Sequence, residues 1–72
     1  MSREYVVIYE WAGNNYSAYV PDLPGCVSTG KTLDEAERNI REAIEGHLVL
    51  LRERGEPVPE PVTRAGRVRV AA

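Results

Sequence analysis

The chain has 72 residues, of which 43% are hydrophobic and 28% are charged, with a formal net charge of −2 at pH 7. This size predicts one globular domain over residues 1–72, and the slightly acidic charge excludes a global attraction to nucleic acid. A single cysteine excludes an internal disulfide, and one cysteine with one histidine falls short of a tetrahedral metal site. Because small domains usually need added support, we expect self-association.

The N-terminal part predicts a β-hairpin. Residues 4–11, EYVVIYEW, and 16–20, YSAYV, are rich in the β-branched and aromatic residues typical of strands. Residues 12–15, AGNN, supply the glycine and asparagines that tolerate positive φ angles in a turn. Closing the loop symmetrically then sets the register. The predicted cross-strand pairs are Trp11 with Tyr16, Tyr9 with Ala18 and Val7 with Val20.

A proline-containing connection and a third strand follow. Pro21 and Pro24 lack an amide donor, so they end the second strand and shape the loop. Gly25 then offers a backbone conformation closed to other residues. Residues 26–29, CVST, predict a short strand antiparallel to the second.

A helix is predicted from a capping box at residues 32–35, TLDE, to about Arg54. Thr32 can accept from the amide of Glu35, while the Glu35 side chain reaches back to the amide of Thr32. Apolar residues recur along this segment with a helical period, and Gly55 is a natural stop signal.

The C-terminal part predicts an extended spacer and a fourth strand. Residues 56–61, EPVPEP, have polyproline character, and residues 67–70, RVRV, alternate as a strand with its valines facing inward. Arg64, Arg67 and Arg69 form a local basic cluster that fits the solvated side of an edge strand. The predicted class is therefore α+β, in the order β-β-β-α-β, with a mainly antiparallel sheet and one helix packed on one face.

Because one helix covers only one face of the sheet, the other face is a candidate contact surface. The larger apolar set, which contains the cross-strand pairs above, is assigned to the helix side. The opposite face carries Val6, Ile8, Glu10 and Tyr19, which we predict to form a protein interface. Scattered surface apolar residues would need no partner, but the small domain favours the interface. An inverted assignment would make Trp11 and the tyrosines of the first face the contact.

The sequence does not favour an enzyme. A Cys26–His47 pair could support acyl transfer, yet His47 lies in the apolar stripe of the helix and Cys26 reads as a small buried residue. No nucleophile elbow, phosphate loop or metal motif is present. Asp34 and Glu35 already cap the helix, so a metal-dependent nuclease would have to use Glu10 and Asp22. These two carboxylates are far apart in the sequence and do not make a two-metal site. We therefore predict no catalytic, cofactor-binding or metal-binding residue.

Three segments together resemble the HicB family of antitoxins: YVVIYEW at 5–11, YSAYVPDLPGCVSTGKTLDEAERNIREAIEGHL at 16–48 and ERGEPVPEP at 53–61. Their shared pattern is a strand ending in PDLPGC, a T-G-x-T-x-x-E-A helix start and a G-E-P-x-P-x-P exit. The resemblance covers about Tyr5 to Pro61 and continues weakly into the last predicted strand.

The resemblance implies a partial ribonuclease H-like fold and a non-catalytic module that binds and blocks a small HicA-type toxin. Such toxins are implied to be ribonucleases of double-stranded-RNA-binding-like fold that cleave messenger RNA. Typical members add a C-terminal ribbon-helix-helix or helix-turn-helix domain that binds operator DNA. The sequence ends soon after RVRV, so we expect no direct DNA binding.

Two other functions remain open at this point. One is an orphan homodimer or higher oligomer of this module without a toxin, and the other is the metal-dependent nuclease. The apolar runs are far shorter than a membrane span and MSREY lacks the features of a secretory signal, so we expect a cytoplasmic protein with no membrane contact.

Overall fold

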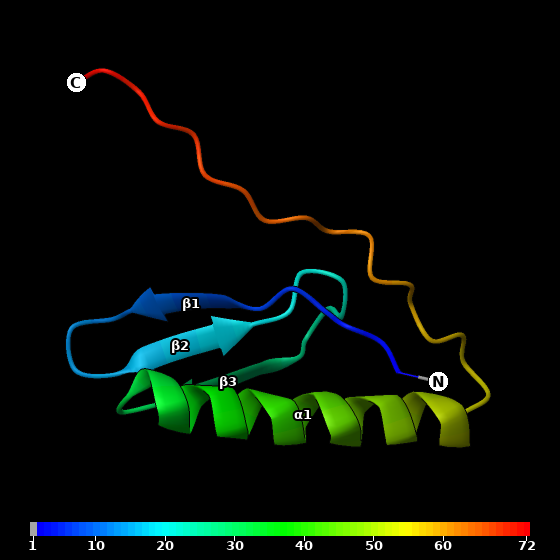
Figure 1. Cartoon of the computed structure of the whole chain (residues 1–72). Helices are drawn as coiled ribbons and strands as arrows, with labels where there is room; N and C mark the ends of the chain where they lie inside the picture. Colours follow the sequence, from blue (N-terminus) through cyan, green and yellow to red (C-terminus); the bar gives the residue numbers. More distant parts are fainter. Residues whose placement is uncertain (1) are drawn as a thin grey trace.

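The computed structural model describes residues 2–72, in which three strands precede one helix (Figure 1). The three strands form one antiparallel sheet in the order β1-β2-β3. The elements are β1 at Ile8–Trp11, β2 at Tyr16–Tyr19, β3 at Val27–Gly30 and α1 at Leu33–Glu53. The α+β class, the antiparallel sheet and the single helix on one face are confirmed.

The register of the hairpin is the predicted one. Trp11 pairs with Tyr16 and Tyr9 pairs with Ala18. At the turn, the amide of Ala12 donates to the carbonyl oxygen of Asn15 at 2.8 Å. The third predicted pair lies beyond the strand ends.

The PDLPGC stretch folds into a tight connection that also contributes to the core. The amide of Val20 donates to the carbonyl oxygen of Cys26 at 3.2 Å, and the amide of Cys26 donates to the carbonyl oxygen of Leu23 at 3.0 Å. Leu23, within this loop, is fully buried. Gly25 has a φ of 83°, which other residues rarely adopt. The stretch is therefore a structural connection between β2 and β3.

The start of α1 follows the capping signal with one difference. The Thr32 side chain accepts a hydrogen bond from the amide of Glu35 at 3.1 Å, as predicted. The Glu35 carboxylate accepts from the amide of Lys31 at 3.1 Å and not from that of Thr32. Gly30 allows the helix to begin close to β3, because a Cβ atom there would lie 2.3 Å from the backbone nitrogen of Ala36.

The hydrophobic core lies between the sheet and α1, which packs chiefly on β3 and β2. Apolar side chains from both layers and from the connection form it. The buried members are Ala18, Val20, Leu23, Cys26, Ala36 and Ile40, and the half-buried ones packed against them are Tyr5, Val7, Tyr9, Ala43, Ile44 and Leu48. The predicted helix-side face of the hairpin is thus confirmed up to Tyr9. No helix in residues 2–72 is both long and apolar enough to cross a membrane.

After α1 the chain is first held against the body of the domain. The hydroxyl of Tyr5 donates to the carbonyl oxygen of Pro59 at 2.6 Å. The Asp22 carboxylate accepts from the amides of Val62 and Thr63, at 3.2 and 3.0 Å, and from the Thr63 hydroxyl at 2.8 Å. These contacts hold the extended spacer, as far as Thr63, against the segment before β1 and against the β2–β3 connection.

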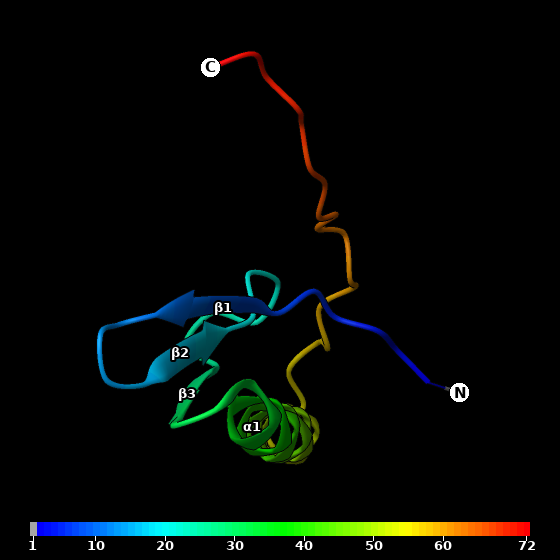
Figure 2. The ribbon, with the colours of Figure 1, turned by 60° about the vertical axis from the view of Figure 1, so that its left-hand side comes forward.

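From residue 64 the chain runs outward as an exposed, extended tail (Figures 1 and 2). The prediction of a fourth strand at 67–70 is wrong for the isolated chain. The segment is extended, but no strand within residues 2–72 pairs with it. A strand needs a neighbour to satisfy its backbone, and an alternating pattern does not specify which neighbour that is.

Candidate protein interface

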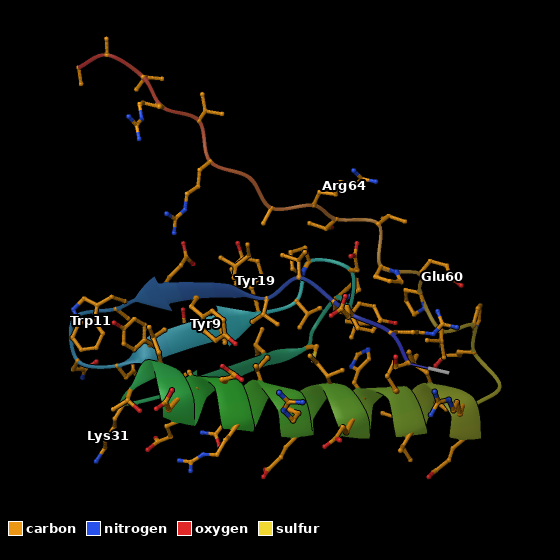
Figure 3. All side chains as sticks on the ribbon, in the orientation of Figure 1. Tyr9, Trp11, Tyr19, Lys31, Glu60 and Arg64 are labelled. Atoms are coloured by element: carbon orange, nitrogen blue, oxygen red, sulfur yellow. The ribbon has the colours of Figure 1, made fainter. Side chains whose placement is uncertain are left out.

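The sheet face turned away from α1 carries a row of apolar side chains, of which two are exposed and one is half-buried. Ile8 pairs with Tyr19 and Tyr19 pairs with Val27, so these three side chains lie side by side on one face. Tyr19 is 38% exposed and Val27 is 64% exposed. Figure 3 shows Tyr19 on the side of the sheet away from α1 and Tyr9 on the side toward it. We call this row, Ile8–Tyr19–Val27, the outer row.

Three of the four predicted interface residues belong to this face by register. Ile8 and Tyr19 are in the outer row, and Glu10 lies on the same face, where it pairs with Ser17. Val6 precedes β1 and is half-buried. That these residues contact a partner stays a prediction.

Val27 is a member of this face that the sequence pattern did not predict. It follows the buried Cys26 and is itself exposed, which is the alternation of a strand with one solvated face. That signal was present in CVST, but a four-residue strand is too short for the alternation to assign the faces without knowledge of the neighbouring strand.

Trp11 departs from its predicted place in the core. The register puts it on the helix side, yet it is 57% exposed because α1 packs chiefly on β3 and β2 and leaves the hairpin tip uncovered. Its ring lies 4.9 Å from that of Tyr16, centroid to centroid, at an interplanar angle of 60°. This aromatic pair is what the inverted assignment would use as a contact.

A second surface feature lies on the helix side of the domain. A groove of about 520 Å³ opens between β1 and α1. Charged side chains of both signs surround it, and its apolar floor consists of Val7, Tyr9, Ile40, Ile44 and Leu48. The groove exists because the single helix leaves the β1 side of this face partly uncovered.

The structure does not assemble the suspected catalytic groups into one site. Cys26 is buried in the core, and burial raises the pKa of its thiol, which opposes formation of a nucleophilic thiolate. The prediction of a small buried cysteine is confirmed, and His47 is half-buried on α1. Among the residues described, no three His, Cys, Asp or Glu side chains come together as a possible metal site.

Asp22 has a structural task that the sequence did not reveal. Its pKa is lowered by the hydrogen bond from the Thr63 amide, then by that from the Thr63 hydroxyl and, with a smaller effect, by that from the Val62 amide. Glu10 lies toward the hairpin end of the sheet, opposite Ser17, while Asp22 follows the other end of β2. The two carboxylates therefore lie on different parts of the surface.

Comparisons with known proteins agree with this architecture. A family model described as "HicB_like antitoxin of bacterial toxin-antitoxin system" matches residues 5–69. The N-terminal domain of the antitoxin HicB of Burkholderia pseudomallei is 41% identical, with a TM-score of 0.70 over 81% of this chain and 69% of that one. A chain in a structure described as the HicA3 and HicB3 toxin-antitoxin complex is 28% identical, with a TM-score of 0.71 over 83% of this chain and 70% of that one.

Relatives known from sequence are also similar. A UPF0150 protein of Helicobacter pylori is 63% identical over 35 residues, which are 49% of each chain. A protein of Haemophilus phage HP1 is 41% identical over 56 residues, which are 78% of this chain and 42% of that one. The matches thus span about half the length of these curated relatives or less.

Proposed function

Because the chain belongs to the HicB-like antitoxin family, we propose that it neutralises a small HicA-type, messenger-RNA-cleaving toxin by binding it directly. The similarity to a chain of a toxin-antitoxin complex supports a toxin as the partner. The observation that carries the proposal is the outer row, an apolar stripe on the sheet face that α1 does not cover, in which Tyr19 and Val27 are exposed and Ile8 is half-buried.

The chemistry of this face suits a protein partner. Protein interfaces combine an apolar centre, often with an aromatic anchor, and a polar rim. Tyr19 would be the anchor, between Ile8 and Val27, and Glu10 and Ser17 would lie at its side. A protein that binds RNA carries positive surface, and Glu10 would complement it.

We further propose that the module acts by covering the toxin and not by catalysis. The nuclease alternative needs Glu10 and Asp22 to serve one site, whereas Asp22 is engaged with Thr63 and Glu10 pairs with Ser17 toward the hairpin end. Blocking by contact is stoichiometric, so inhibition would be complete at about one module per toxin.

The proposal is tested by co-expression and capture. The tagged chain is expressed in its native cells, and captured proteins of small size and basic charge are then expressed alone in a test host. The proposal predicts a captured protein that arrests growth and cleaves messenger RNA, with both effects relieved by the chain. Failure to capture any such protein, or a captured toxin that the chain does not relieve, would contradict it.

A variant pair connects this test to the outer row. Tyr19→Glu places a charge in the apolar stripe, and Val49→Glu places the same charge on an exposed position of α1. We expect only Tyr19→Glu to lose capture and relief. If both variants lost capture and relief equally, or if neither lost them, the contact with the toxin would not lie on this face.

A further inference from the structure

The exposed tail has the composition of a strand without a neighbour. Val68 is 87% exposed and Val70 is 72% exposed, and they alternate with Arg67 and Arg69. Every residue from 64 to 72 is exposed. Valines that alternate with charged residues are typical of an edge strand with one buried side and one solvated side. In this tail neither side is buried.

The root of this tail is fixed. Asp22 holds Val62 and Thr63 by three hydrogen bonds, and Tyr5 holds Pro59 by one. Beyond this root the tail points away from its own sheet in both views (Figures 1 and 2). The radius of gyration is 13.9 Å, whereas about 11 Å is expected for a compact chain of this length. The tail is therefore presented outward from a held root.

Of the two edges of the sheet, the β1 edge is the more open to such a strand. At the β3 edge, the Asn39 side chain donates to the carbonyl oxygen of Thr29 at 2.8 Å, and α1 packs alongside. At the β1 edge, no strand of the described chain lies next to Ile8–Trp11. Unpaired edges of this kind are templates for a strand from another chain.

The two sides of the β1 edge match the two sides of the tail. On the helix side lies the groove with Val7 and Tyr9 on its floor, and on the other side lies Glu10. Successive side chains of an added strand point to opposite faces. Val68 and Val70 would then cover the groove, while Arg67 and Arg69 would lie on the face of Glu10. The alternation of apolar and charged residues in the tail therefore matches the two sides of the β1 edge.

We propose that residues 64–70 of one copy add as a fourth strand to the β1 edge of a second copy, so that two chains exchange their tails. The exchange forms a two-fold symmetric dimer in which each copy completes the sheet of the other. It pairs the backbone N–H and C=O groups along the free edge of β1, and it buries the valines that the isolated chain exposes. This dimer does not depend on the toxin.

Charge reversal tests the exchange because the tail and the β1 edge that receives it can be changed in separate chains. One variant carries Glu10→Arg, and a second carries Arg67→Glu with Arg69→Glu; these positions are exposed, and circular dichroism checks that each variant folds. Native mass spectrometry and light scattering at low salt measure assembly. We expect a wild-type dimer, a dissociation constant at least about tenfold higher for each variant alone, and a heterodimer when the two are mixed.

Two further chains complete the design. A chain that ends at Thr63 should be monomeric, and Val68→Asp with Val70→Asp should weaken the dimer at least as much as the charge reversals do. A monomeric wild type, or a dimer that persists without residues 64–72, would overturn the proposal. A third outcome would also overturn it: the two charge-reversal variants do not form a heterodimer when mixed, yet one chain that carries all three substitutions behaves like the wild type. That outcome would mean that the tail pairs with the sheet of its own chain.

Discussion

Asp22 and Thr63, 41 residues apart in the sequence, are joined by two hydrogen bonds: the Thr63 amide and hydroxyl donate to the two oxygens of the carboxylate at 3.0 and 2.8 Å. This contact connects the β2–β3 connection to the chain beyond α1. It decides where the bound spacer ends and where the exposed tail begins.

Loss of the Asp22 charge should release the root of the tail. Asp22→Asn keeps the shape but weakens the charge-assisted bonds to the Val62 and Thr63 amides. We expect faster amide hydrogen exchange at these two residues, with the amides of α1 unchanged. Unaltered exchange at Val62 and Thr63 would show that the clamp does not hold the tail.

Acid should release the same root. The folded-state pKa of Asp22 is lowered from its ordinary value of 3.8, so its contribution is fully present above that value and is lost as the pH falls through the lower folded pKa. The Thr63 amide resonance, followed by nuclear magnetic resonance, should therefore titrate below pH 3.8. In Asp22→Asn that transition should be absent, and its persistence would assign it to another group.

A side chain at Gly30 should destabilise the domain. A Cβ atom there would lie 2.3 Å from the nitrogen and 2.7 Å from the Cα atom of Ala36, so β3 and α1 would have to separate. We expect Gly30→Ala to lower the free energy of unfolding by about 1–3 kcal/mol in urea denaturation.

Gly46 is the matched control for that change. It lies inside α1, and a Cβ atom there would meet nothing within 4 Å. Gly46→Ala should raise the free energy of unfolding by about 0.5–1 kcal/mol, because alanine is the better helix former. A similar loss in both variants would contradict the close approach at Gly30.

Leu23 should be among the most sensitive core positions. It belongs to the PDLPGC connection and is fully buried in the core, and Leu23→Ala should lower the free energy of unfolding by about 2–5 kcal/mol. Val62→Ala, at an exposed position, should change it by less than about 0.5 kcal/mol. A small effect at Leu23 would mean that the connection does not contribute to the core.

The sequence predicted the parts of the fold that depend on neighbouring residues. The capping box at Thr32 and the register of Trp11 with Tyr16 follow from signals within a few positions, and the family resemblance was confirmed over residues 5–69. The contact of Asp22 with Thr63 carries no local signal, because its partners meet only after the helix has brought the chain back.

The fourth strand and the outer row show the same limit. RVRV predicts an extended segment, but strand pairing requires a neighbour that the pattern does not name, and in the isolated chain the segment stays unpaired. Likewise, Val27 joins Ile8 and Tyr19 only through the register between three strands. Local pattern predicts which segments are helical or extended, whereas strand pairing and contacts between elements depend on tertiary geometry.

The proposed contact between the outer row and the toxin is tested most directly by the affinity of the purified chain for the captured toxin, measured by calorimetry. We predict that Tyr19→Glu raises the dissociation constant at least about 30-fold, the size of an interface hot spot of about 2 kcal/mol, while Val49→Glu leaves it within threefold. Unchanged affinity in a folded Tyr19→Glu variant would contradict the claim and place the toxin on another surface.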